Sequence, residues 1–314
     1  MRKTYKVKKN IKYKGKRSNK IFHKTIRRGK NIKKVLSGGS LIGQGNFGCV
    51  FRPELTSKLS STHSGNIVSK VVLKNNAFSE YRHEFKILKK MRDIDPKGLF
   101  HSLMVDAYEL ESKHVPEDFQ KCSLTKPSYN VNEFFVFNIA YSGNHNLTYY
   151  LKHIFNVRKD SKQIPEPSIL FSLMTNIIVG IKTMIHGNIV HKTLNTDSIF
   201  LIEPLSLENP YSAKIIDYGE GELRKYRGYN DKNQDYITFF KSIIRMLSVV
   251  FRNEHHDKSH DKVIQDLIDG FTKLLSMVEK NNVSYNEVIK SYILLLQNTF
   301  GKNYAEYAKT KYKA

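Results

Sequence analysis

The chain has 314 residues, of which 40% are hydrophobic, and a formal net charge of +23. This length and composition suffice for one large globular domain or two lobes and exclude a wholly disordered chain. No run approaches the roughly 18 uncharged apolar residues that a membrane-spanning helix needs, and the basic N-terminus has no apolar stretch of a signal peptide behind it, so we predict a soluble intracellular protein.

The positive charge is concentrated at the N-terminus. Residues 1–40 hold 16 of the 52 Lys and Arg residues and no acidic residue. Such a self-repelling segment stays extended, and we predict a basic disordered tail over residues 1–37 that ends at the flexible SGGS (37–40). Its partner through residues 1–36 would be nucleic acid or another polyanion, or a nuclear-import receptor. The alternative is a solvated arm without a fixed partner.

The two cysteines, Cys49 and Cys122, have no CxxC spacing. Two cysteines are too few for the disulfide framework of a small secreted domain. We therefore expect reduced thiols in the cytoplasm or nucleus.

Residues 38–141 are mostly strand-like. β-Branched and aromatic residues predict strands in LIGQGNFGCVF (41–51), NIVSKVVLK (66–74) and EFFVFNIAY (133–141). The polar RPELTSKLSSTHSG (52–65) reads as an inserted loop. Between the second and third strands, Phe78, Tyr81, Phe85 and Leu88 recur three or four residues apart, which predicts one helix over 78–91.

Residues 142–300 change to helical periodicity, and a short basic tail follows over 301–314. Apolar faces predict helices in residues 168–187, 235–251 and 262–278. Ser284 and Glu287 have capping-box spacing ahead of a last helix. Two short strands are predicted in SIFLIE (198–203) and AKIIDY (213–218). The fold class is therefore α+β, with a small strand-rich part before a larger helical part.

A glycine-rich run and two charged residues form the first candidate site. In GQGNFGCV, Gly43, Gly45 and Gly48 lie between two strands, where their backbone N–H groups would contact phosphates and Val50 would cover a base. Lys70 lies on the next strand, and Glu84 on the following helix is the candidate partner that holds it, with Glu80 as a competitor. Each piece alone is more often an ordinary turn or a surface charge.

Together with later segments, these residues resemble the motifs of protein kinases. The match consists of GQGNFGCV, IVSK with Glu84, the hinge-like IAYSG (139–143), NLTYYL, IVHKTLNTDSIFL (189–201) and KIIDYGEG (214–221), in order over about residues 38–250. The proline-bearing GCVFRPEL and the long loop after it are similar to divergent kinases of large DNA viruses, whose setting is the host cell or the virion. The resemblance implies a two-lobed protein kinase fold, with an N-lobe over 38–141 and a C-lobe over 142–300.

The resemblance also implies a site for ATP and Mg²⁺. ATP would contact the glycine-rich loop, the Lys70–Glu84 pair and the hinge, and Asp217 of DYG would bind the Mg²⁺ that bridges the phosphates. The full set of nucleotide-binding residues is Gly43, Gln44, Gly45, Asn46, Phe47, Gly48, Val50, Lys70, Glu84, Ala140 and Ser142.

The reactive part of the pattern departs from the family. His191 keeps the histidine that shapes the catalytic loop, but Thr193 replaces the catalytic aspartate and Asn195 replaces the lysine near the γ-phosphate. Ser198 replaces the asparagine that binds a second Mg²⁺ and is a weak ligand, while Asp197 is a candidate substitute. Only 18 residues separate Asp217 from the aspartate that resembles the start of the family's buried central helix, Asp235, which leaves little chain for a peptide-substrate platform.

A separate metal site is conceivable in NEHHDKSHDK (253–262), where His256 and His260 have i, i+4 spacing. A polar loop explains this tract better.

We expect a pseudokinase, a nucleotide-dependent interaction module with weak or absent phosphotransfer that presents a surface to a protein partner. The first alternative is an active atypical serine/threonine kinase with a protein substrate. The second is a nucleic-acid-binding scaffold that acts through the basic tail.

Overall fold

The computed structural model describes residues 39–45, 48–55, 66–74, 80–112, 115, 117–125, 130–155, 165–205, 212–224, 229–253, 257–280 and 283–303. The chain divides into two units, residues 1–35 and 36–314. The first unit, which contains most of the predicted basic tail, lies outside the described residues, as do positions 304–314 of the predicted C-terminal tail. The predictions for both tails therefore remain predictions.

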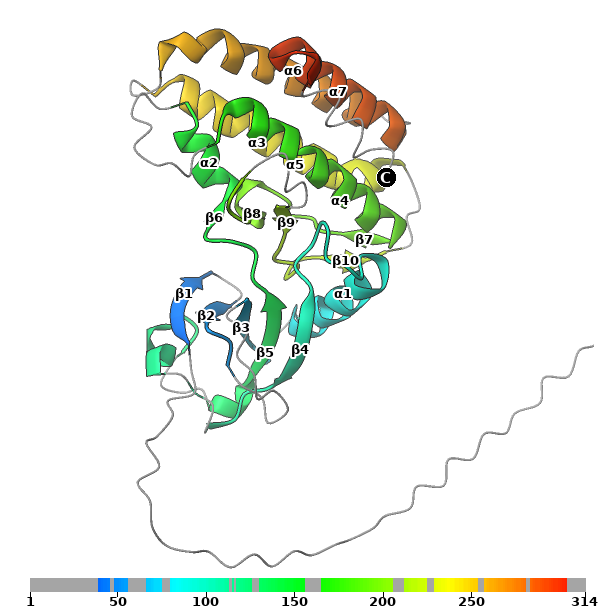
Figure 1. Cartoon of the computed structure of the whole chain (residues 1–314). Coiled ribbons are helices and arrows are strands. Elements are labelled where there is room, and N and C mark those ends of the chain that lie inside the picture. Colours follow the sequence, from blue (N-terminus) through cyan, green and yellow to red (C-terminus); the bar gives the residue numbers. More distant parts are fainter. Residues whose placement is uncertain are drawn as a thin grey trace, which may run out of the picture. The chain divides into compact units, whose positions relative to one another are not determined.

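The second unit has mixed α+β architecture, as the sequence predicts (Figure 1). Among the described residues, an antiparallel sheet has the strand order β1-β2-β3-β5-β4. Its strands are β1 (Ser40–Gln44), β2 (Cys49–Arg52), β3 (Ile67–Leu73), β4 (Met104–Glu109) and β5 (Phe134–Ala140). Helix α1 (Glu80–Ile94) packs on this sheet through Tyr81 and Phe85, whose rings contact Phe135 of β5.

The sequence predicted this region well except at two points. Strand β4 was not predicted, because MVDAYE carries two acidic residues and its side chains alternate only weakly between buried and exposed. Helix α1 begins at Glu80, and Phe78 of the predicted apolar face lies outside the described residues.

The helical region follows β5. Its helices are α2 (Leu147–His153), α3 (Pro167–Leu173), α4 (Thr175–His186), α5 (Tyr229–Phe251), α6 (Asp261–Glu279) and α7 (Tyr285–Phe300). The predicted helix over 168–187 is two helices, because Met174, with ψ of −16°, departs from α-helical geometry between them. The capping box predicted at Ser284 and Glu287 is confirmed at the start of α7.

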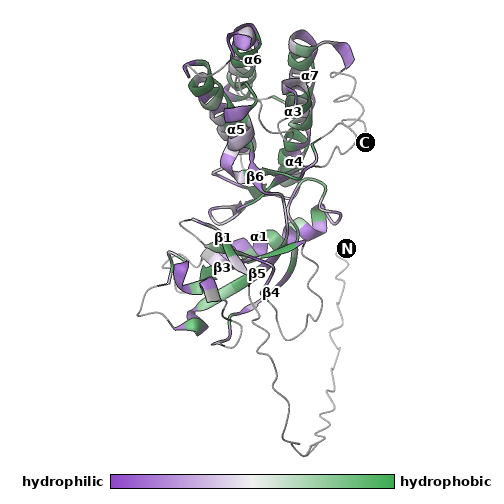
Figure 2. Ribbon diagram, turned by 60° about the vertical axis from the view of Figure 1, so that its left-hand side comes forward, coloured by the Kyte–Doolittle hydropathy of each residue, from purple (hydrophilic) through white to green (hydrophobic). Residues whose placement is uncertain are grey.

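The predicted apolar faces form the core. Phe239, Phe240 and Ile243 of α5 and Ile264 and Phe271 of α6 are fully buried in one cluster that also includes residues of α1 and of the sheet. Figure 2 shows the mainly hydrophobic composition of β5 and α4. Burial of these faces is the main favourable term in folding, since burying a large aliphatic or aromatic side chain contributes about 1.5–3 kcal/mol.

One stretch, Pro167–His186, is by length and composition apolar enough to cross a membrane, although it is not a run of 18 uncharged residues. Lys182 is the only Asp, Glu, Lys or Arg residue within this stretch. However, 72% of its apolar window is buried inside the fold, where Leu170, Ile177 and Ile181 join the core. The stretch therefore serves as a pair of helices that are mostly buried in the core.

Short strands link the two regions. The two strands predicted in SIFLIE and AKIIDY are confirmed as β8 (Ile199–Leu201) and β9 (Ala213–Ile215), which pair in the order β6-β8-β9 with β6 (His145–Asn146). Strand β7 (Ile189–Val190) pairs with β10 (Glu222–Leu223). These pairings help to fix the positions of two candidate site residues, because β7 ends directly before His191 and β9 ends two residues before Asp217.

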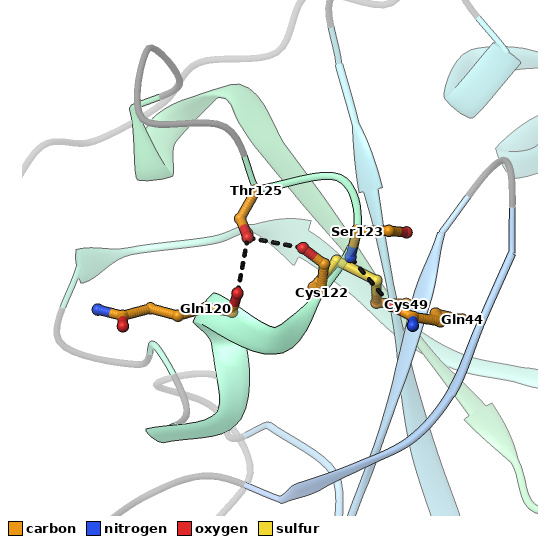
Figure 3. Close-up of a disulfide and its surroundings, with 6 residues drawn as sticks. All are labelled: Gln44, Cys49, Gln120, Cys122, Ser123 and Thr125. Carbon is orange, nitrogen blue, oxygen red and sulfur yellow. Dashed lines mark hydrogen bonds between the residues drawn. A yellow bond between two sulfur atoms is a disulfide. The ribbon is translucent and has the colours of Figure 1, made fainter.

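The cysteine prediction is wrong. Cys49, at the start of β2, and Cys122 form a disulfide across 73 residues of sequence (Figure 3). The error arose because spacing in the sequence does not reveal that the segment after β4 packs against β2. With both cysteines in a disulfide, the cysteine content no longer indicates a reducing compartment.

Candidate functional site

A cavity of about 440 Å³ lies between the sheet and the segments around β8 and β9. The turn between β1 and β2 covers it, β3 and α1 contribute charged side chains, and the chain after β5 forms one edge. The cavity is large enough for a small ligand of the size that proteins commonly enclose.

Glycines of the β1–β2 turn line the cavity. The Gly45 N–H donates to the Gly48 carbonyl over 2.9 Å, which closes the turn. A Cβ atom at Gly43 or Gly45 would meet nothing within 4 Å, so the space beside the backbone is open. At Gly48 it would lie 3.0 Å from the Val71 carbonyl and 3.2 Å from Cε of Lys70, so this position needs glycine for close strand packing. Asn46 and Phe47 lie outside the described residues.

Lys70 is the central charge of the site. It pairs with Val50 across β2 and β3, and its Nζ lies 2.7 Å from Glu84 Oε1 and 2.7 Å from Asp217 Oδ1. The structure thus brings together the three charged residues predicted to serve one ligand, from β3, α1 and the segment after β9. Glu84 supplies an α1 carboxylate in contact with Lys70, as predicted, whereas the side chain of its competitor Glu80 lies outside the described part of the chain.

The charges of this cluster are strongly coupled. Burial opposes the charged form of Lys70, but Glu84 and Asp217 outweigh it and raise the lysine pKa above its usual value. Burial raises the pKa of Glu84, whereas the Lys70 ammonium lowers the pKa of Asp217. Asp217 is therefore the carboxylate of the pair that stays ionised most readily, and about half of its side chain is exposed, at 49%.

The backbone around Asp217 is unusual. Its φ is 64°, in the left-handed region that non-glycine residues seldom adopt and that persists where the surroundings impose it, often at functional sites. The next residue, Tyr218, is buried, and its ring centroid lies 5.0 Å from that of His191. His191 Nε2 in turn lies 2.8 Å from the Ile216 carbonyl. The segment that carries Asp217 is thereby fixed to the loop after β7.

Asp235 of α5 fixes that loop. Its two carboxylate oxygens accept hydrogen bonds from the backbone N–H groups of His191 and Lys192, each over 3.0 Å. Lys192 has a φ of 69° and Asp235 is only 2% exposed. The sequence placed Asp235 at the start of a buried helix, but α5 begins at Tyr229, so Asp235 lies in its second turn.

The next part of the loop is organised by its own hydrogen bonds. The Asn195 side chain accepts from the N–H groups of Asp197 and Ser198 and so begins a short 3₁₀ helix. The Asp197 carboxylate is exposed and accepts from Asn146, while the Ser198 hydroxyl donates to the Thr193 carbonyl over 3.4 Å. Thr193, Asn195, Asp197 and Ser198 are all absent from the cavity lining. The suggested role of Asp197 as a substitute metal ligand therefore stays a prediction.

The cavity edge after β5 includes the predicted Ala140 and Ser142. The Ser142 hydroxyl contacts that of Ser102, which also lines the cavity. Sequence reasoning did not single out the apolar side chains around this edge, although each lies in a segment that it predicted as a strand, Phe200 on β8 and Ile216 directly after β9 among them. These additional lining residues are Val68, Ile139, Phe200 and Ile216.

Arg52 was also missed. Its guanidinium carbon lies 3.8 Å from the ring centroid of Tyr141, and both residues line the cavity. This contact is within cation–π range. No pattern in the sequence joins these two positions.

The charged side chains of the cavity do not form a cluster of metal ligands among the described residues. Within the described part of the chain, no group of three or more His, Cys, Asp or Glu side chains is placed to hold a metal. Asp217 is the carboxylate that could hold one Mg²⁺ bound to phosphates, whereas Ser198 points its hydroxyl elsewhere. In the histidine-rich tract, His256 lies outside the described residues and the ring of His260 packs beside Phe155.

Comparisons with known proteins do not assign the chain to a family. No protein-family model matches the chain, and no curated protein matches it significantly.

We expect Asp235→Asn to destabilise the protein by about 1–3 kcal/mol, the cost of an unsatisfied buried polar group. An amide has one acceptor oxygen, so its NH₂ group would face one of the two N–H donors. Urea unfolding measures the change. Asp197→Asn, on the same loop but exposed, is the matched control and should stay within about 0.5 kcal/mol of wild type. Equal losses would contradict a special role for Asp235.

Proposed function

We propose that the chain has a two-lobed protein kinase-like fold, binds ATP with Mg²⁺, and has weak or absent phosphotransfer. The observation that carries this proposal is the triad of Lys70, Glu84 and Asp217 beneath a glycine turn, with 2.7 Å contacts from the lysine to both carboxylates. The sheet with α1 would be the N-lobe, and the helical region would be the C-lobe.

Each part of the cavity has a role in this proposal. The open space beside Gly43 and Gly45 admits phosphate groups close to backbone N–H donors. The Lys70 ammonium would bind the α- and β-phosphates, and the apolar edge after β5 would hold the adenine ring. Asp217 would hold Mg²⁺, which neutralises phosphate charge.

Thr193 is the reason to expect weak transfer. A neutral hydroxyl does not accept a proton from a substrate at neutral pH, and general-base assistance contributes roughly 10²–10⁴ in rate. Asn195 and Ser198, which replace a lysine and a metal ligand, are engaged in their own loop. Binding of the nucleotide would survive these losses, because it depends on other residues.

One observation favours the alternative of an active atypical serine/threonine kinase. Asp235 and His191 hold the loop and the Asp217 segment in a defined arrangement, and phosphoryl transfer depends largely on positioning and charge neutralisation. Residual transfer that falls when Asp217 is replaced would support this alternative. The nucleic-acid scaffold rests on the charge of the N-terminal segment alone, which lies outside the described residues.

Thermal melting of the full chain in a titration with ATP and Mg²⁺ tests the proposal. Ligand at about 100 times its dissociation constant stabilises a protein by about 2.7 kcal/mol, which we expect as a rise of several degrees in the melting temperature. The rise should be smaller with ATP and a chelator, because phosphate charge is then not neutralised. No rise with any nucleoside triphosphate would refute nucleotide binding.

A further inference from the structure

The β1–β2 hairpin, residues 40–52, covers the cavity, and we call it the roof. The disulfide joins this roof to a segment that follows β4. Cys49 directly follows Gly48 and is paired with Gln44 at the closed end of the β1–β2 hairpin. Its partner Cys122 follows a 3₁₀ helix, Glu117–Lys121, in the connection between β4 and β5. We call residues 117–125 the clasp.

Two hydrogen bonds add to this covalent link. The Ser123 N–H donates to Oε1 of Gln44 over 3.0 Å (Figure 3), and the Leu41 N–H donates to Oδ2 of Asp118 over 3.4 Å. Gln44 and Leu41 both belong to β1, whereas Cys49 belongs to β2. The clasp therefore holds both strands of the hairpin.

The clasp is itself anchored. The Phe119 ring lies between Phe51 of β2, at 6.2 Å, and Phe134 of β5, at 5.1 Å between ring centroids. The Cys122 carbonyl accepts from the N–H and the hydroxyl of Thr125, over 3.0 and 2.7 Å, which fixes the turn shown in Figure 3. Such a packed and internally bonded segment can restrain what it contacts.

The clasp acts from behind the roof. Val50 of β2 and Lys70 of β3 line the cavity. Cys49 and Phe51, the two neighbours of Val50 along β2, are instead buried in a separate apolar cluster with Phe119 and Cys122. At the two described glycines near the tip of this hairpin, Gly43 and Gly45, an added Cβ atom would meet nothing within 4 Å. The position of the hairpin thus depends on contacts on its far side.

We propose that the clasp is a positioning element of the nucleotide site and that reduction of the Cys49–Cys122 disulfide weakens nucleotide binding. The inference rests on the proposed function of the cavity. Without the covalent link, a smaller fraction of the molecules would have the hairpin in its binding position. The apparent affinity for the nucleotide falls in proportion to this fraction. We expect roughly a fivefold increase in the dissociation constant.

The chemical step needs a named reductant, a small dithiol. One of its thiolates attacks a sulfur of the disulfide to form a mixed disulfide, and its second thiol then displaces the protein sulfur. The products are two protein thiols and the cyclic disulfide of the reagent, with two electrons and two protons transferred to the protein. Cys49 is 0% and Cys122 2% exposed, so the hairpin must open before the reagent can attack.

The test measures the dissociation constant of a fluorescent ATP analogue with Mg²⁺ for the full chain, before and after dithiol treatment, with thiol titration to count the reduced cysteines. We expect fivefold weaker binding after reduction and recovery on reoxidation. The Cys49→Ser/Cys122→Ser variant should bind like the reduced chain in either condition. If this variant fails to fold, the comparison on the wild-type chain remains decisive.

A stability control separates positioning from general weakening. Leu274→Ala, in the α6 core, should lower the melting temperature without changing the dissociation constant. Hydrogen exchange over residues 41–52 is a second readout and should accelerate on reduction. Equal affinities for the oxidised and fully reduced chains would overturn the inference. If neither the oxidised nor the reduced chain binds nucleotide, the proposed function fails, and the effect on affinity fails with it. If hydrogen exchange over residues 41–52 is also the same in both forms, the clasp does not position the hairpin.

Discussion

Lys70→Met is expected to abolish the stabilisation of the protein by ATP and Mg²⁺. The substitution keeps a side chain of similar length but removes the ammonium that lies 2.7 Å from both Glu84 and Asp217. The carboxylates of Glu84 and Asp217 would then face the phosphates of ATP without a cation between them. Negative charges this close to one another repel strongly in a partly buried site. We expect the dissociation constant for ATP to rise by at least about 100-fold, from the loss of a desolvated charge pair.

The same substitution should lower intrinsic stability. Glu84 is 3% exposed, and removal of one partner of a buried ion pair typically costs about 3–5 kcal/mol. Part of this loss will be recovered, because burial already raises the pKa of Glu84 and the carboxyl can bind a proton. Unfolding by urea without nucleotide therefore has to accompany the binding measurement.

Lys74→Met is the matched control. Lys74 follows directly after β3 and pairs with Glu109, a carboxylate that is 69% exposed, over 3.3 Å. Such surface pairs contribute about 0–1 kcal/mol, so this variant should bind ATP like the wild type and lose little stability. If Lys70→Met binds ATP as well as Lys74→Met does, the cavity is not a nucleotide site of the kind proposed.

Thr193→Asp is expected to increase phosphotransfer by roughly 10²–10⁴, the range of general-base assistance. The loop that carries Thr193 is already fixed, since Asp235 accepts from the two preceding backbone N–H groups and His191 contacts the segment of Asp217. A carboxylate at position 193 would supply a proton acceptor without requiring a new loop. Transfer of radioactive phosphate from ATP to a general protein acceptor measures the effect.

Thr193→Asn is the control for this experiment. Asparagine has nearly the size of aspartate but takes up no proton at neutral pH, so its rate should stay near that of the wild type. Equal rates for the two variants would show that position 193 does not serve as the base. A wild-type rate within the usual kinase range of about 1–100 s⁻¹ would contradict weak transfer and establish the active kinase.

Features that depend on neighbours in the sequence were predicted well. The apolar face of Tyr236, Phe239, Phe240 and Ile243 in α5 follows from helical periodicity. The capping box at Ser284 follows from a spacing of three residues, and β3 and β5 follow from runs of β-branched and aromatic residues. Strand β4 was missed because a strand with partly exposed faces and acidic residues has no strong local pattern.

The candidate site was predicted through the resemblance, which implies that its residues serve one ligand, and not through any local pattern. Gly45, Lys70, Glu84 and Asp217 were singled out, and all four line one cavity. Asp197 was also considered, but it faces Asn146 outside that cavity. The contact of Arg52 with Tyr141 was not anticipated, because the two residues lie on different elements and neither has an unusual neighbourhood in the sequence.

The sequence by itself determined which segments form helices and strands, which of their faces are buried, and which residue types are available for chemistry, since these depend on periodicity and local hydrogen bonding. The tertiary structure alone decided that Lys70 meets Asp217, 147 residues away, that Asp235 holds the loop of His191, and that Cys49 meets Cys122. Such contacts arise when buried faces pack together, and the packing depends on the shape of the whole core rather than on any short stretch of chain.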